Sequence, residues 1–134
     1  MPTIISPWQS AFIKGRSITD NILLAQELFR NYHRTAGPAR CALKVDLKQA
    51  FDSVSWTFIL DAMRLLLFPT KFIYWVKSCI TSSRFSVKLN GSLCGYFKGG
   101  RGLRQGDPLS PYLFVIAMEV LAKIIDKNTK NLLF

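Results

Sequence analysis

The chain has 134 residues, of which 49% are hydrophobic and 13% aromatic, so it is long enough for one domain with a real core and is not a disordered segment. Eighteen Lys and Arg residues outnumber eight Asp and Glu residues and give a net charge of +10, which favours a polyanionic partner such as nucleic acid. The alternative is a solvated basic surface without a specific partner.

Signals for a membrane or for secretion are absent from the sequence. The longest apolar stretch, 112–122, is interrupted by Glu119 and is too short to cross a bilayer. The N-terminus lacks the charged-then-apolar pattern of a signal peptide. The three cysteines are odd in number and no two have the spacing of metal ligands, so we expect reduced thiols and a nuclear or cytoplasmic location.

The first third of the chain predicts a loop, a helix and a strand. Residues 2–18 are expected to be irregular, because two prolines and a glycine interrupt any period. A helix is predicted over about 20–34, with Thr19 as its N-cap and a Gly-Pro pair beyond its end. Alternating apolar residues in the segment 41–47 predict a buried strand.

Two helices are predicted next. Ser55 is the expected N-cap of a helix that Pro69 stops, and a second helix covers about 70–81. The side chains expected to face the core are Trp56, Ile59, Leu60, Met63, Leu66 and Leu67 in the first helix and Phe72, Ile73, Val76 and Ile80 in the second.

A hairpin and a last helix follow. Alternating apolar runs on either side of Asn90-Gly91 predict the hairpin, since both turn positions tolerate positive φ. Ser110 as N-cap and Pro111 as the first residue start the last helix. Its expected polar side carries Glu119, Lys123 and Lys127, and its expected buried side carries Phe114, Ala117, Leu121 and Ile124. The elements together predict an α+β fold, with helices packed on a small antiparallel sheet.

The segment 43–52 carries the first candidate chemistry. Asp46 at a strand end and the carbonyl of Leu47 offer hard oxygen ligands of the kind that Mg²⁺ prefers. A lone carboxylate more often only ends a strand or caps a turn, and one carboxylate cannot hold two metal ions. Phe51 lies beyond a turn, where its ring either packs against a sugar or belongs to the core. Asp52 is expected to hydrogen-bond within the turn or to the next helix, and not to bind metal.

The segment 102–111 carries the second group of residues with candidate chemistry. Its glycines allow close approach of the backbone to a ligand. Arg101 and Arg104 can meet phosphates, and Gln105 offers an amide to a sugar or a base edge. The helix N-terminus after Ser110 adds partial positive charge. The alternative is a glycine-rich loop that the helix cap alone stabilises.

In this order and spacing, the two segments resemble motifs A and B of the reverse transcriptases encoded by non-LTR (LINE-type) retrotransposons, particularly the plant kind. The segment 6–18 and the hairpin at 85–97 are similar to neighbouring parts of the same family, so the resemblance covers about residues 2–125. It implies a partial reverse transcriptase domain over 1–134, a fragment of a right-hand palm and fingers domain. Motif A falls at about 41–56 and motif B at about 99–118.

The resemblance also implies roles for single residues. Asp46 matches the metal ligand of motif A, and Phe51 matches the aromatic residue that excludes ribose 2′-hydroxyls. Gln105 and Gly106 match the motif B residues that touch the incoming nucleotide and the template pair. Arg16 lies in the stretch that the family places near the template path. The implied partners are an RNA template, a DNA primer and deoxynucleoside triphosphates, and the implied cofactor is Mg²⁺.

The family's motif C with its paired aspartates and its thumb do not follow in this sequence, and its upstream fingers motifs would precede Met1. We therefore expect an inactive fragment of marginal stability by itself, from a decayed genomic copy or a mispredicted gene. One alternative is a non-catalytic, basic remnant that binds nucleic acid. Another is a structural or regulatory chain that completes itself by pairing with a partner.

Overall fold

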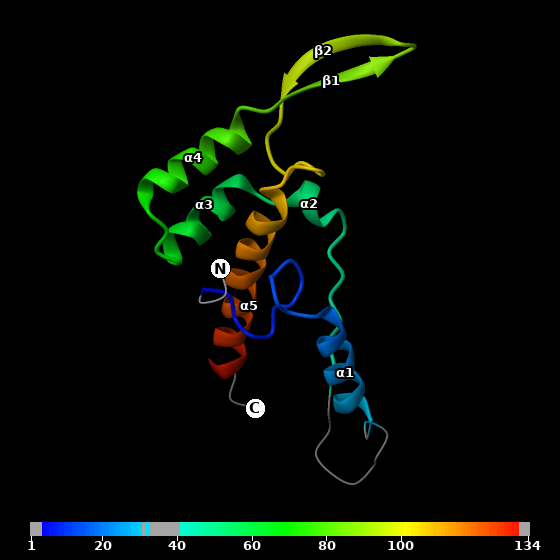
Figure 1. Ribbon diagram of the computed structural model, residues 1–134, viewed down its shortest axis with the longest axis vertical. Helices are drawn as coiled ribbons and strands as arrows, with labels where there is room; N and C mark the ends of the chain where they lie inside the picture. Colours follow the sequence, from blue (N-terminus) through cyan, green and yellow to red (C-terminus); the bar gives the residue numbers. More distant parts are fainter. Residues whose placement is uncertain (1–3, 31, 33–40, 132–134) are drawn as a thin grey trace. The chain divides into compact units, whose positions relative to one another are not determined.

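The computed structural model describes residues 4–30, 32 and 41–131, and the chain divides into two compact units, 1–48 and 49–134. The first unit contains helix α1, and the second contains helices α2 to α5 and the strands β1 and β2 (Figure 1). The described helices include none that is long and apolar enough to span a membrane. The α+β composition predicted from the sequence is confirmed.

The N-terminal part of the first unit is an irregular loop, as predicted, and one arginine organises it. The guanidinium of Arg16 donates hydrogen bonds to the backbone carbonyls of Ser6 at 2.5 Å, Gln9 at 2.6 Å and Ile5 at 3.2 Å. Charge-assisted donors of this kind satisfy several carbonyls at once, so the loop has a defined path without regular structure.

Helix α1 spans Ile18–Phe29, which differs from the prediction at both ends. Ser17 is the N-cap, because its extended backbone lets its hydroxyl accept a hydrogen bond from the amide of Thr19; the prediction of Thr19 as the cap was wrong. The helix ends five residues before the predicted Arg34, which lies outside the described residues. None of the side chains of α1 is buried.

The segment 41–47 is exposed and has no regular structure, so the predicted buried strand is wrong. A strand forms only where a neighbouring strand satisfies its amides and carbonyls. The described part of the chain contains one sheet, and its two strands pair only with each other. Apolar alternation alone therefore does not produce a strand here.

In the second unit, a short helix α2 (Ala50–Ser53) leads to α3 (Trp56–Leu65), whose predicted N-cap is confirmed by the hydrogen bond from Phe58 N to Ser55 Oγ. Helix α4 spans Thr70–Thr81, as predicted. Each helix presents three or more apolar side chains to the core.

Helix α3 ends at Leu65, before the point at which Pro69 would stop it. Leu67 has a left-handed backbone with φ of 58°, and its amide donates to the carbonyl of Arg64 at 3.0 Å. The amide of Phe68 donates to the carbonyl of Met63, also at 3.0 Å. This pair of bonds is a Schellman motif, which closes the last turn. It leaves Leu67, which was expected to face the core, 89% exposed.

Strands β1 (Arg84–Leu89) and β2 (Ser92–Lys98) form the predicted hairpin, and the turn residues Asn90 and Gly91 have the expected positive φ of 48° and 87°. The hairpin extends away from the helices of its unit (Figure 1). Every residue of β2 is exposed. The register shifts by one residue within the hairpin, which marks a β-bulge.

The core of the second unit lies between α3, α4 and the long helix α5 (Ser110–Asn131). Its buried apolar residues are Ile59, Leu60, Ala62, Met63, Ile73, Val76, Ile80, Leu103, Leu113, Val115, Ile116, Ala117 and Val120. On α5 the prediction of Ile124 as buried was wrong, since it is 45% exposed. Glu119, expected on the polar side, is buried and pairs with Lys123 Nζ at 3.0 Å.

Candidate functional site

The loop that precedes α5 is joined by hydrogen bonds to the segment around α2. The amide of Gly102 donates to the carbonyl of Val54, and the amide of Leu103 donates to the carbonyl of Phe51, both at 2.8 Å. The indole of Trp56 donates to the carbonyl of Gly102 at 2.6 Å. The second candidate segment is therefore held against the C-terminal part of the first one.

Gly102 is required by this arrangement. Its φ is 88°, and a Cβ added there would lie 2.7 Å from the carbonyl oxygen of Asp52. No side chain fits at that distance from rigid backbone, and the left-handed conformation itself disfavours other residues. The predicted close approach of a glycine is thus present, but at Gly102 it is to the chain's own backbone rather than to a ligand.

A cavity of about 440 Å³ lies beside this loop, entirely within the second unit. Its apolar wall includes Ile80, Leu103 and Leu113, from α4, the loop and α5. Its polar wall is formed mainly by Asp52, Arg101, Arg104, Gln105 and Asp107. A few converging polar groups on an apolar pocket are typical of a small-molecule site.

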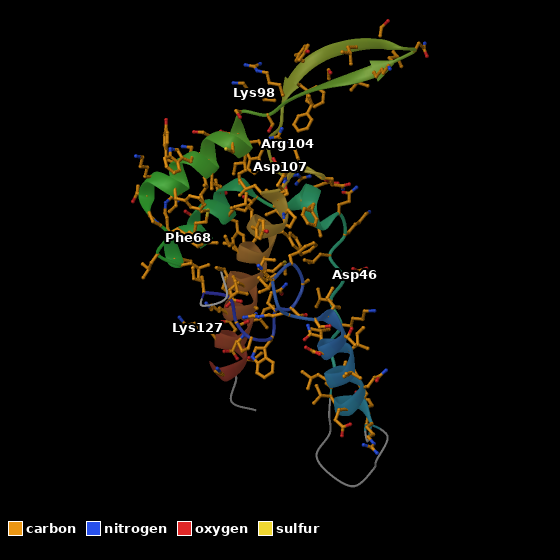
Figure 2. All side chains as sticks on the ribbon, in the orientation of Figure 1. Asp46, Phe68, Lys98, Arg104, Asp107 and Lys127 are labelled. Carbon is orange, nitrogen blue, oxygen red and sulfur yellow. The ribbon has the colours of Figure 1, made fainter. Side chains whose placement is uncertain are left out.

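Asp107 fixes the position of Arg104. One carboxylate oxygen accepts a hydrogen bond from Arg104 Nη2 at 3.3 Å, and the other accepts one from the amide of Leu109 at 2.9 Å. Figure 2 shows Arg104 and Asp107 near the start of α5. Half-exposed ion pairs contribute at most about 1 kcal/mol to stability, so the effect of this pair is mainly on the orientation of Arg104. Arg101 is exposed, and no ion pair among the described residues involves it.

The N-terminus of α5 lies at the cavity, where Leu109, Ser110 and Leu113 contribute to the lining. Ser110 is the first residue of the helix, one position earlier than the prediction of Ser110 as the cap and Pro111 as the first residue. The amide of Leu109 is satisfied by Asp107. The first turn of a helix carries partial positive charge, which favours an anion in the cavity.

Phe51 packs on the core side of this region. Its ring stacks on Phe114 of α5, with ring centroids 4.7 Å apart and an angle of 16° between the planes. This contact agrees with the core alternative that the sequence left open. The residues that line the cavity do not include Phe51, and its role in excluding a 2′-hydroxyl stays a prediction.

The remaining predicted site residues belong to the first unit. Asp46 and Leu47 are exposed in the irregular segment, and Arg16 is half-buried with its guanidinium on backbone carbonyls. Within the described ranges, no three His, Cys, Asp or Glu side chains gather to hold a metal ion. The exposed Asp46 carboxylate and the Leu47 carbonyl are nevertheless of the right type for Mg²⁺, which keeps several water ligands.

The structure thus places Arg104 and Gln105 at the cavity, directly after Leu103, whose amide donates to the carbonyl of Phe51. Gly106 is not among the residues that line the cavity, and its predicted role stays a prediction. The contributors that sequence reasoning missed include Trp56, which was expected only in the core, and Cys79, which lines the cavity from α4. The hydrogen bond of Trp56 reaches a residue 46 positions away, and local periodicity carries no signal for such a contact.

The whole chain, residues 1–134, matches the family model of the reverse transcriptase (RNA-dependent DNA polymerase). The chain therefore belongs to the reverse transcriptase family, whose members act on an RNA template and nucleotide substrates and use Mg²⁺. The resemblance to the enzymes of non-LTR retrotransposons is confirmed by three relatives.

The transposon TX1 uncharacterized 149 kDa protein of Xenopus laevis is 33% identical over 129 residues, which are 96% of this chain and 10% of the relative. The Pol polyprotein of the type-1 retrotransposable element R2 of Nasonia vitripennis is 33% identical over 124 residues, 90% of this chain and 12% of the relative. The Pol polyprotein of element R2DM of Drosophila melanogaster is 30% identical over 119 residues, 89% and 11% respectively. The chain spans about a tenth of the length of these relatives.

Proposed function

We propose that this chain is the middle of a retrotransposon polymerase domain and that, within a longer polypeptide, it binds the nucleotide that is added to a DNA primer on an RNA template. One observation carries the proposal: the hydrogen bonds of Gly102 and Leu103 to the segment around α2 hold Arg104 and Gln105 at a cavity beside a helix N-terminus. Positive charge at that point suits a triphosphate.

The reaction forms a bond between the 3′-oxygen of the primer and the α-phosphorus of the nucleotide, and pyrophosphate leaves. Little covalent help is needed, since positioning and charge stabilisation dominate phosphoryl and nucleotidyl transfer. Arg104 and Arg101 would offset the charge of the triphosphate, and Gln105 would orient the sugar or base through its amide. Phe51 would limit the space beside the 2′-position.

Asp46 and the carbonyl of Leu47 would hold Mg²⁺, which neutralises charge on the reacting phosphates when it is bound. A clamp of two metal ions needs at least one further carboxylate beside Asp46. We therefore expect no polymerisation by this chain alone. The nuclear or cytoplasmic location also stays a prediction.

Nucleotide binding by the cavity is tested by calorimetric titration of a deoxynucleoside triphosphate in the presence of Mg²⁺. Arg104→Ala is expected to weaken binding about tenfold, because it removes a charge-assisted hydrogen bond to phosphate. Arg64→Ala is the matched control, since Arg64 also forms an exposed ion pair with an aspartate three residues away. Equal affinities of the two variants would contradict the proposal.

Primer extension on an RNA template, with Mg²⁺ and deoxynucleotides, tests the expected lack of activity. Incorporation by the chain should not exceed that of the Asp46→Ala variant. Incorporation that Asp46→Ala abolishes would mean that another carboxylate, such as Asp52 or Asp107, completes a metal site in this chain.

The alternative of a non-catalytic, nucleic-acid-binding remnant is favoured by one observation, the net charge of +10. A steep loss of affinity with salt, independent of Mg²⁺ and without nucleotide binding at the cavity, would support it over the polymerase function.

A further inference from the structure

The middle of the sequence carries charge of one sign only. Between Asp61 and Asp107 there is no acidic residue, whereas eight basic residues occur there: Arg64, Lys71, Lys77, Arg84, Lys88, Lys98, Arg101 and Arg104. In the structure this stretch includes α4, the hairpin and the loop before α5. The four ion pairs described in the second unit lie in α3, in α5 and at its start, and none involves the hairpin.

The β-bulge sorts the side chains of the hairpin onto two faces. Phe85 lies opposite Phe97, but Val87 lies opposite Cys94, so Ser86 faces the two residues Gly95 and Tyr96. Gly95 has φ of 68°, as in bulges that begin with a left-handed glycine. This extra residue shifts the alternation of β2 by one position.

As a consequence, one face of the hairpin, which we call the basic face, carries Arg84, Lys88, Tyr96 and Lys98 together with Ser86 and Leu93. The opposite face carries the stacked rings of Phe85 and Phe97 together with other apolar side chains. Without the bulge, Phe97 would fall among the basic residues and Lys98 would fall among the apolar ones. Figure 2 shows Lys98 at the base of the hairpin.

The arrangement of charges on the basic face destabilises the hairpin. Arg84 and Lys98 are directly opposite each other in the ladder, and like charges at such positions are destabilising. No acidic residue of the hairpin offsets them. The ring of Tyr96 lies beside these charges and is 75% exposed. An apolar ring and uncompensated positive charge on one exposed surface match the chemistry of a polyanion that also has flat, stackable groups.

We propose that the basic face binds single-stranded nucleic acid, with phosphates on Arg84, Lys88 and Lys98 and an unpaired base stacked on Tyr96. A base inside a duplex keeps its neighbours on both sides and cannot stack on a protein ring, so an exposed aromatic side chain selects single strands. The source of this single strand, the template of the polymerase, rests on the proposed function. RNA and DNA share the chemistry of phosphate and base, and the test compares them.

The test is fluorescence anisotropy of the full chain with labelled single strands of about 12 nucleotides, RNA and DNA, and with the corresponding duplexes, at several salt concentrations. The triple variant R84Q/K88Q/K98Q is expected to lose at least tenfold in single-strand affinity and to reduce the salt slope by about 2, or about 0.7 for each lost phosphate contact. The matched control is R64Q/K127Q/K130Q, which removes one Arg and two Lys from exposed positions on α3 and α5. An equal loss in both triple variants would overturn the proposal, because net charge alone would then explain binding.

Variants of Tyr96 provide the second part of the test. Tyr96→Ala is expected to weaken single-strand binding about tenfold and to leave duplex binding unchanged, whereas Tyr96→Phe keeps the affinity because it keeps the ring. Loss of affinity for both strand types, or no loss in Tyr96→Ala, would overturn the stacking role. A higher affinity for RNA than for DNA would identify the RNA template as the ligand, and the reverse would identify the DNA strand.

Folding and the proposed function are tested separately. The triple variant should unfold at the same temperature as the parent chain or higher, because it removes a like-charged pair; if it does not fold, Lys98→Gln alone replaces it. The hairpin variants should keep the nucleotide affinity of the cavity. Normal nucleotide binding with no single-strand defect would refute this inference alone, and a single-strand defect without nucleotide binding would refute only the proposed function.

Discussion

Helix α4 and the segment 41–47 are both short and rich in apolar residues, but only α4 has regular structure. The amides and carbonyls of a helix pair within the helix itself, whereas those of a strand need a second strand. Accordingly, Ile73 and Val76 of α4 are buried, and Leu43 is 87% exposed. Apolar patterning predicts an element well only when the hydrogen bonds of that element join residues that are near in the sequence.

The largest effect is expected from a core residue of the helical region. Met63 of α3 is completely buried, so Met63→Ala should lower the free energy of unfolding by about 2–5 kcal/mol through lost burial and a cavity. Urea denaturation followed by circular dichroism measures the change. A loss below about 1 kcal/mol would mean that the core between α3 and α5 is loosely packed.

The second-largest effect is expected at the contact between Gly102 and Asp52, which joins two distant segments. Gly102→Ala forces a side chain against the carbonyl of Asp52 and a strained φ, so we expect a loss of about 2–4 kcal/mol and loss of nucleotide binding. Gly106→Ala is the matched control, with φ of 86° and no atom within 4 Å of the added Cβ, and should cost about 1 kcal/mol. Equal costs for the two variants would contradict the close docking of the loop on α2.

A smaller, opposite effect is expected at the end of α3. Leu67→Gly relieves a left-handed residue whose side chain is 89% exposed, so stability should rise by about 0.5–1 kcal/mol after the entropic cost of glycine. Thermal unfolding would detect an increase of a few degrees. Leu66→Gly, at a residue with φ of −86°, should instead lower stability. A loss of stability in Leu67→Gly would show that this end of α3 is not held by its Schellman motif.

The smallest effect is expected in the irregular segment 41–47. Leu43→Ser replaces an exposed apolar residue of the irregular segment and should change the free energy of unfolding by less than about 0.5 kcal/mol. The same urea titration measures it beside Met63→Ala. A cost near that of Met63→Ala would mean that the segment is buried in solution and that the strand predicted there exists.

Part of the candidate site could be predicted from the sequence, because its chemistry lies in short motifs. Arg104 and Gln105 were predicted to meet a ligand, and both line the cavity. Phe51 was left between two roles, and its stacking on Phe114 agrees with the core role. Glu119 was expected to face solvent, since its neighbours along α5 suggest a polar side, but it is buried. Burial depends on what packs over a residue, which local periodicity does not contain.

The sequence by itself determined the features whose causes are local. The bounds of α4, the cap at Ser55 and the turn at Asn90-Gly91 follow from residues within one or two turns of the chain. The family follows as well, since it depends on the order and spacing of motifs.

The tertiary structure decided the features that join distant residues. Only in the fold does Gly102 lie against Asp52, and only the strand register makes Arg84 the neighbour of Lys98. The segment 41–47 is the converse case, because its pattern suits a strand and no described strand pairs with it. The physical reason is the same in all three: a hydrogen bond or a close contact needs a partner, and the partner is chosen by the fold.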